Sequence, residues 1–189
     1  MLTIIHEANA ILGKANAYLA PKSDRIALSL PDLSSLEEAD SVRAIVTGNP
    51  VRSDIAALYA HPYNTPDIEA PFHVTVMGGS LGAKVMAQNV PQALSSLAED
   101  LKIRLNVTQQ CHAEDMADVQ DIYTQAGISV TLKEFLDDVP SVLKDTHLMI
   151  ARAGASTVSE TAIAGIPAIY IPYPHHADQQ QKINAQSIS

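Results

Sequence analysis

Residues 72–83 read FHVTVMGGSLGA, in which a run rich in β-branched and apolar side chains leads directly into three glycines. This pattern predicts a strand over Phe72–Met77, a glycine-rich turn over Gly78–Ala83 and a helix over Lys84–Leu97. Glycines allow a backbone to approach a phosphate closely, and the following helix presents free N–H groups and its positive dipole end. Ser80 adds a hydroxyl donor. The spacing is neither that of a P-loop nor that of GxGxxG, so a tight turn without a ligand is an equally open interpretation.

The alternation of apolar runs and amphipathic segments continues along the chain. Strands are predicted at 103–108, 129–132, 147–151 and 168–171, and helices at 113–126, 139–144, 157–164 and 178–187. Strands that alternate with helices indicate a parallel, doubly wound, Rossmann-like α/β sheet. In such a sheet ligands bind at the carboxyl ends of the strands, in the loops that lead into helices.

The first 47 residues differ in character from the rest. They contain His6-Glu7-Ala8-Asn9, an acidic stretch over 32–40 and a strand-like run over 44–47, and a proline-rich loop follows at 62–71. The last predicted helix is followed by neither a strand nor a capping glycine. We therefore expect that both ends of the chain are cut and that it is a piece of a longer protein.

Composition argues against several classes of function. The formal net charge of −9 disfavours nucleic-acid binding, which needs clustered Lys and Arg, and electrostatic adsorption of the chain to anionic lipid. No apolar run approaches the ~20 residues of a membrane span, and the N-terminus lacks the basic flank of a signal peptide. Cys111 is the single cysteine, so neither a disulfide framework nor a zinc site is expected. A cytoplasmic location without a bound metal is the expectation.

Glu160 follows the predicted strand at 147–151 and has two interpretations. A carboxylate near a helix start can accept hydrogen bonds from a ribose diol, as acidic residues do in other nucleotide-binding folds. Alternatively, Thr157-x-x-Glu160 is a capping box, in which the carboxylate bonds back to the Thr157 N–H. Local sequence favours the cap.

Other polar residues also stand next to predicted strands. Arg52 follows the strand-like run at 44–47 and suits bidentate phosphate contact, although a surface arginine is the ordinary interpretation. The amides of residues 179–181 and of Asn184 could bond sugar hydroxyls, or form a polar helix face with Asp178 in the first turn. His175-His176 is a poor metal site, because adjacent histidines lack a carboxylate partner at helical spacing. His6 and Glu7 could form an acid/base pair, but neighbouring residues rarely face the same way.

Taken in order, these segments resemble the peptidoglycan N-acetylglucosaminyltransferase family (MurG). That family runs HEQN, GNPVR, GGSQGA, RSGALTVSE and PYPHxxDxxQxxNA. The matching segments here are His6–Asn9, Gly48–Arg52, Gly78–Ala83, Arg152–Glu160 and Pro172–Ala185. The resemblance covers essentially the whole chain, with departures at Ala8, Leu81, Ala153 and Ser156.

The resemblance implies the C-terminal, donor-binding domain of a GT-B glycosyltransferase, incomplete at its end, over 48–189. A remnant of the N-terminal acceptor domain and the linker would occupy 1–47. The implied donor-binding residues are Asn9, Arg52, Ser80, Leu136, Ala155, Ser156, Thr157, Val158, Ser159, Glu160 and Gln181. A second group consists of His6, Glu7, Gly79, Gln180 and Asn184. In the family's pattern Ser80 faces the donor, Arg52 contacts the diphosphate, Leu136 and residues 155–160 enclose uridine and ribose, and Gln181 and Asn9 hold the sugar.

The implied activity is an inverting transfer of N-acetylglucosamine from UDP-N-acetylglucosamine to a lipid-linked muramyl pentapeptide (lipid I to lipid II). The reaction belongs to peptidoglycan synthesis, and so to cell wall biogenesis, cell shape and division. No metal and no cofactor are implied. The acceptor site, the catalytic base and a peripheral contact with the cytoplasmic face of the inner membrane would lie on the missing domain, so the isolated chain is expected to be inactive. A non-catalytic UDP-sugar-binding fragment and a UDP-sugar epimerase of the same architecture are the alternatives.

Overall fold

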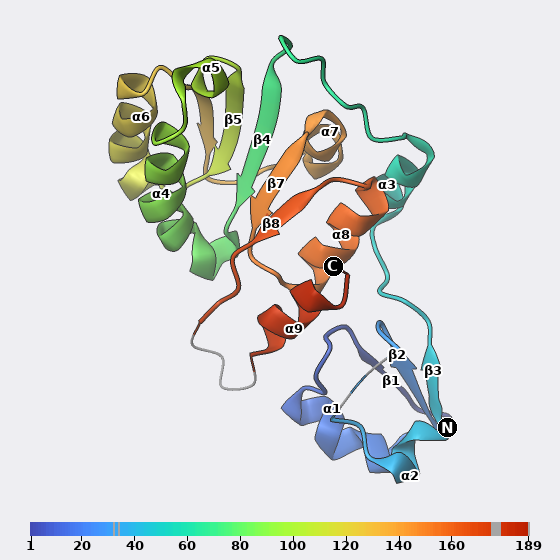
Figure 1. Ribbon diagram of the computed structural model, residues 1–189. Helices are drawn as coiled ribbons and strands as arrows, with labels where there is room; N and C mark the ends of the chain where they lie inside the picture. Colours follow the sequence, from blue (N-terminus) through green and yellow to red (C-terminus); the bar gives the residue numbers. More distant parts are fainter. Residues whose placement is uncertain (32, 34, 175–178, 189) are drawn as a thin grey trace. The chain divides into compact units, whose positions relative to one another are not determined.

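The computed structural model describes residues 1–31, 33, 35–174 and 179–188, and it divides the chain into two compact units (Figure 1). Unit 1 consists of Met1–Val51, Ala153–Ser159 and Pro172–Ser189. Unit 2 consists of Arg52–Arg152 and Glu160–Ile171. The domain boundary expected at residue 48 from the sequence remains a prediction.

Unit 2 is built on a five-stranded, fully parallel sheet with the order β6-β5-β4-β7-β8. The strands are β4 (Phe72–Met77), β5 (Leu105–Gln110), β6 (Ser129–Lys133), β7 (Leu148–Ala151) and β8 (Ala168–Tyr170). The chain starts in the middle of the sheet, moves outward to β6 and then returns to the other side of β4. This is the Rossmann arrangement, and its switch point lies between the carboxyl ends of β4 and β7.

Helices cover both faces of this sheet (Figure 1). They are α3 (Ser53–Ala56), α4 (Gly79–Ser95), α5 (Glu99–Lys102), α6 (Met116–Gln125), α7 (Val139–Asp145) and α8 (Ala155–Ala164), with the 3-10 turns η2 (Ala57–Ala60) and η3 (Ala113–Asp115). The first half of α8 is counted in unit 1. Successive residues of β7 separate the two faces, because side chains alternate along a strand. Ile150 packs in the core formed with α4 and α6, whereas Met149 and Ala151 pack in the core formed with η2, α7 and the end of α8.

The predicted doubly wound α/β fold is confirmed, and every strand and helix expected from residue 72 to 171 occurs in the expected order. The prediction for the glycine segment is corrected by the structure. The expected turn over Gly78–Ala83 is shorter, because α4 begins at Gly79 rather than at Lys84. The expected capping box is also wrong. Because α8 begins at Ala155, both Thr157 and Glu160 lie inside the helix rather than at its start.

Unit 1 contains a second, three-stranded parallel sheet with the order β1-β2-β3. Its elements are β1 (Ile4–Glu7), α1 (Lys14–Leu19), η1 (Ala20–Lys22), β2 (Arg25–Leu28), α2 (Glu38–Ser41), β3 (Ala44–Val46) and α9 (Gln180–Gln186). Its core consists of Ala20, Ile26, Leu28 and Leu33. The sequence predicted β3 but neither β1 nor β2. No helix in the described part of the chain is long and apolar enough to cross a membrane.

Candidate functional site

Each glycine of the predicted phosphate-binding turn is required for its own reason. A Cβ at Gly78 would lie 2.4 Å from the Ala83 nitrogen. Gly79, the first residue of α4, has φ +62°, a conformation that side chains disfavour. A Cβ at Gly82 would lie 2.7 Å from Nε of Arg152. Gly78 therefore permits a tight backbone turn and Gly82 admits the Arg152 side chain, at the start of a helix of 17 residues at the sheet's switch point. The N–H groups at such a helix start can bind an anion.

Ser80 and Arg152 are two further residues at the glycine turn. Ser80 is the first-turn residue that the sequence assigned to the donor, and its side chain lies outside what the structure describes. Arg152 directly follows β7 and was not singled out by the sequence. It is buried, packs against Gly82, and donates from Nη1 to the carbonyl of Ile171 at 2.9 Å. The sequence feature that could have identified Arg152 is its position directly after a predicted strand. Arg152 thereby fixes the end of β7 against the start of α4.

The carboxylate of Glu160 is half-buried on α8 and interacts with the charges of Arg52, which directly precedes α3, and of Asp54 in α3. Burial raises its pKa above the ordinary value, the Arg52 charge acts in the opposite direction, and the Asp54 charge adds to the rise. No hydrogen bond to the Glu160 side chain comes from the described residues. Its oxygens are therefore available to hydroxyl donors of a ligand.

Arg52 occupies the position before the first residue of α3. Its side chain is 54% exposed, and its Nε lies 3.8 Å from Oδ1 of Asp54. An exposed pair at this distance restrains the guanidinium weakly, so Arg52 can turn toward an anion. Leu136, also assigned to the donor, is half-buried in the loop between β6 and α7.

In unit 1, Glu7 is part of the scaffold. It is 3% exposed. Its Oε1 accepts from the backbone N–H and the side-chain amide of Asn9, both at 3.0 Å, and its Oε2 accepts from the Gly13 N–H and the Asn16 amide, both at 2.8 Å. Burial acts to raise the pKa of Glu7, but the hydrogen bonds from Gly13, Asn16 and Asn9 together lower it below the ordinary value. A carboxylate held in this way is a weak base.

His6 does not pair with Glu7. Its Nε2 lies 3.2 Å from the carbonyl oxygen of Gly48 and 3.3 Å from the hydroxyl of Ser29. Neighbouring residues of a strand point to opposite faces, which keeps the two side chains apart. The acid/base pair considered from the sequence is not formed.

Asn184 of α9 joins three segments of unit 1. The residue is 1% exposed. Its Oδ1 accepts from the Ala10 N–H at 2.8 Å, and its Nδ2 donates to Oδ1 of Asn9 at 3.1 Å and to the carbonyl of Ala153 at 3.2 Å. The Asn184 amide is thus buried and hydrogen-bonded within unit 1, and its contact with the donor remains a prediction.

Gln181 keeps one hydrogen-bonding group open. Its Oε1 accepts from the Tyr173 N–H at 2.8 Å, and no described residue accepts from its amide nitrogen. Gln180 opens α9 beside it. His175, His176 and Asp178 lie outside the described residues. Elsewhere in the chain, among the residues that the structure describes, no group of three His, Cys, Asp or Glu could hold a metal ion.

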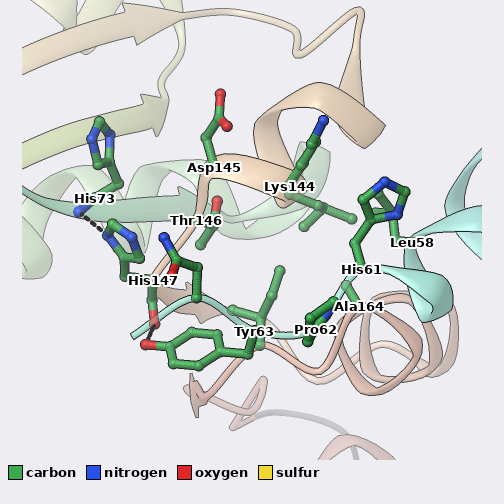
Figure 2. Close-up of a pocket in the computed structure, with 13 residues that line it drawn as sticks. Leu58, His61, Pro62, Tyr63, His73, Lys144, Asp145, Thr146, His147 and Ala164 are labelled. Atoms are coloured by element: carbon green, nitrogen blue, oxygen red, sulfur yellow. Dashed lines mark hydrogen bonds between the residues drawn. The ribbon is translucent and has the colours of Figure 1, made fainter. Parts of the chain in front are cut away.

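A cavity of about 540 Å³ lies at the opposite, amino-terminal edge of the five-stranded sheet (Figure 2). The His73 N–H donates to Nδ1 of His147 at 2.9 Å, and the Tyr63 hydroxyl donates to the His147 carbonyl at 3.0 Å. Burial lowers the pKa of His147, the His73 charge lowers it further, and Asp145 opposes both. A neutral His147 thus ties the loop before β4 to β7. None of the donor-binding residues expected from the sequence lines this cavity.

The domain has a parallel sheet in Rossmann order, a glycine-rich turn at the carboxyl edge of the sheet, and a carboxylate on the helix after β7 that accepts no hydrogen bond from the described residues. These features are typical of a nucleotide-binding α/β domain. Residues 73–189 match the glycosyltransferase family 28 C-terminal domain, and the chain belongs to this family.

Relatives and solved structures agree with this assignment. The chain is 43% identical over 185 residues to the UDP-N-acetylglucosamine–N-acetylmuramyl-(pentapeptide) pyrophosphoryl-undecaprenol N-acetylglucosamine transferase of Rhodospirillum centenum, covering 98% of this chain and 49% of that protein. It is 46% identical to the protein of the same name from Gluconobacter oxydans, covering 98% and 50%. The crystal structure of Acinetobacter baumannii MurG superposes with a TM-score of 0.75 at 29% identity, covering 98% of this chain and 50% of that one.

A UDP-GlcNAc 2-epimerase from Neisseria meningitidis, solved bound to UDP-GlcNAc, has a TM-score of 0.53 at 13% identity, covering 93% of this chain and 54% of that one. At this identity the likeness concerns the fold. The chain spans about half the length of the curated relatives that it matches.

Proposed function

We propose that this chain supplies the donor-binding part of an inverting transferase that moves N-acetylglucosamine from UDP-N-acetylglucosamine to a lipid-linked muramyl pentapeptide. The names of the relatives support this donor and this acceptor. In the reaction the C4 hydroxyl of the acceptor sugar attacks the anomeric carbon, the bond to the β-phosphate oxygen breaks, and UDP leaves with the bonding electron pair.

The observation that carries the proposal is the carboxyl edge of the sheet in unit 2. The start of α4 offers backbone N–H groups beside Gly79, where no other described part of the protein lies within 4 Å of the Cβ position. A helix N-terminus and the Arg52 guanidinium can stabilise the charge that develops on departing UDP. The Glu160 carboxylate is suited to accept from the ribose hydroxyls, and Ser80 and Leu136 are proposed to contact the donor from the turn and from the loop after β6.

The residues proposed for the sugar lie in unit 1. Gln181 retains an amide N–H₂ for a sugar hydroxyl, and Asn9 is held in place by Glu7 and Asn184. Ala155–Ser159, at the start of α8, are proposed to border the uridine. His6, Gly79 and Gln180 remain secondary candidates.

The epimerase alternative would need acid/base carboxylates around the donor. Glu7 was its one indication in the sequence. A carboxylate with four hydrogen-bond donors and a lowered pKa does not suit proton transfer, so Glu7 does not support the epimerase.

The acceptor side of the reaction, including the base and a peripheral contact with the cytoplasmic face of the membrane, is proposed to belong to the part of the relatives that this chain does not match. Positioning of the acceptor hydroxyl provides much of the rate in such transfers. The chain alone is therefore expected to bind the donor without transferring the sugar.

Calorimetric titration of the 189-residue chain with UDP tests the proposal. The wild type should bind UDP and UDP-N-acetylglucosamine, and Glu160→Ala should weaken UDP binding by ~1–3 kcal/mol because ribose hydroxyls lose their acceptor. Glu114→Ala, which removes an exposed carboxylate from η3, is the matched control. Affinity should be equal in magnesium and in excess EDTA, since Arg52 and α4 are proposed to neutralise the diphosphate. A wild-type chain that does not bind UDP would refute the proposal.

A further inference from the structure

Gln110 is the last residue of β5 and bridges two loops of unit 2. Its Oε1 accepts from the Gly79 N–H at 3.2 Å, and its Nε2 donates to the carbonyl of Glu134 at 3.1 Å. The side chain is half-buried. Both ends of one amide are thus used, one at the start of α4 and the other in the segment that follows β6.

The position of β5 in the sheet explains why this residue can reach both loops. β5 lies between β4 and β6, and the three strands run parallel. The glycine turn follows β4 and the loop with Leu136 follows β6, so a side chain at the end of β5 stands between them. The bridge needs an acceptor for one loop and a donor for the other, and a carboxamide provides both.

The two bridged loops are proposed to bind different parts of the donor. Gly79 belongs to the turn that faces the diphosphate, and Glu134 lies two residues before Leu136, which is proposed to contact the uridine. A ligand that spans two subsites binds best when their separation already matches its length, because less ordering is then needed on binding.

We propose that Gln110 is a positioning residue that sets the separation of the phosphate-binding turn and the base-binding loop, without itself contacting the donor. This rests on the proposed function. It also implies that the Gly79 N–H is already engaged, so that the N–H groups further along the first turn of α4 are the ones left for phosphate.

The test compares Gln110→Met with Gln120→Met. Methionine approximates the length of glutamine but removes both hydrogen-bonding groups. Gln120 is exposed on α6, where its amide donates to the Thr124 hydroxyl at 3.2 Å, so it controls for the loss of an exposed side-chain bond. Each protein is titrated with UDP, with uridine and with inorganic pyrophosphate, followed by calorimetry or by NMR shifts.

Loss of two hydrogen bonds that fix the spacing should weaken UDP binding about tenfold in Gln110→Met. Binding of uridine and of pyrophosphate, each of which needs one loop, should change by less than about twofold. Gln120→Met should match the wild type with all three ligands. Without ligand, amide hydrogen exchange at Gly79 should be faster in Gln110→Met than in the wild type, because the N–H has lost its acceptor.

Each other outcome is informative. If the wild type binds UDP and Gln110→Met binds it equally well, the positioning role is refuted while the proposed function stands. If uridine or pyrophosphate loses as much affinity as UDP, Gln110 acts on a single subsite, and the spacing role is again refuted. If the wild type does not bind UDP, the proposed function fails and this inference fails with it. Unchanged exchange at Gly79 would remove the structural premise.

Discussion

Glu7 in unit 1 and Glu160 in unit 2 are two partly or fully buried carboxylates whose surroundings shift their pKa values in opposite directions. Around Glu7, burial favours the protonated form, but hydrogen bonds from Gly13, Asn16 and Asn9 outweigh it and the pKa falls. Around Glu160, burial dominates and the pKa rises, although the Arg52 charge offsets part of the effect.

The difference separates a scaffold residue from a candidate ligand contact. The oxygens of Glu7 are occupied by donors from its own loop, so removing them would leave several groups unsatisfied. The Glu160 carboxylate receives no hydrogen bond from the described part of the chain, so a ligand can supply what the protein does not. Both residues stand in segments that resemble family motifs, and the motif alone does not distinguish these roles.

The largest expected effect follows from removing the Glu7 carboxylate. Glu7→Ala leaves two backbone N–H groups and the Asn9 amide without their acceptor and removes one of the two acceptors of the Asn16 amide. This should lower the free energy of unfolding by ~3 kcal/mol. Glu160→Ala removes a carboxylate without such partners and should change the free energy of unfolding by less than ~0.5 kcal/mol. Urea unfolding at pH 7 measures both. If both variants lose the same free energy of unfolding, the hydrogen bonds of Glu7 are not what stabilises the fold at this position.

A smaller effect is expected in the pH dependence of stability. The pKa of Glu7 is lowered from the ordinary 4.5, so its contribution is fully present above that value and is lost as the pH falls through the folded pKa. The pKa of Glu160 is raised from 4.5, so the folded state binds its proton more readily, and stability falls as the pH rises from 4.5 through the folded pKa.

Unfolding measured from pH 3 to 7 in Glu7→Gln and Glu160→Gln should resolve the two signs. Glu7→Gln should flatten the loss of stability in acid. Glu160→Gln should instead remove a decline that begins at about pH 4.5 and continues upward. If the slope of the free energy of unfolding against pH changes in the same direction in both variants, the opposite pKa shifts are contradicted.

The five strands of unit 2 and the helices α4, α6, α7 and α8 were predictable because apolar runs and glycines are local signals, whereas the single-turn helices α3 and α5 were not predicted. The start of α4 was not predictable, since it depends on the positive φ of Gly79 and on the packing of Arg152 against Gly82. The capping box failed for a similar reason. The carbonyl of Gly154 accepts from the Val158 N–H at 2.9 Å, which starts the helix before Thr157.

The candidate site was predictable in part. The residue types at the strand ends could be read directly from the sequence, and their assignment to the donor remains a proposal. The role of Glu7 depends on Gly13 and Asn16, which lie across a loop, and the role of Asn184 depends on segments more than 170 residues away in the chain. Gln110 was missed because the predicted strand ended at residue 108, two positions before it.

The most direct test of the claim that Glu160 accepts from the ribose hydroxyls is a cycle of two proteins and two ligands. Wild type and Glu160→Ala are each titrated calorimetrically with UDP and with 2′-deoxy-UDP. In the wild type, loss of the 2′-hydroxyl should cost about tenfold in affinity, because the half-buried carboxylate loses one of its two proposed donors. In Glu160→Ala the two ligands should bind equally, since the acceptor is absent. If 2′-deoxy-UDP loses the same factor in both proteins, Glu160 does not bind the ribose hydroxyl and the account is contradicted.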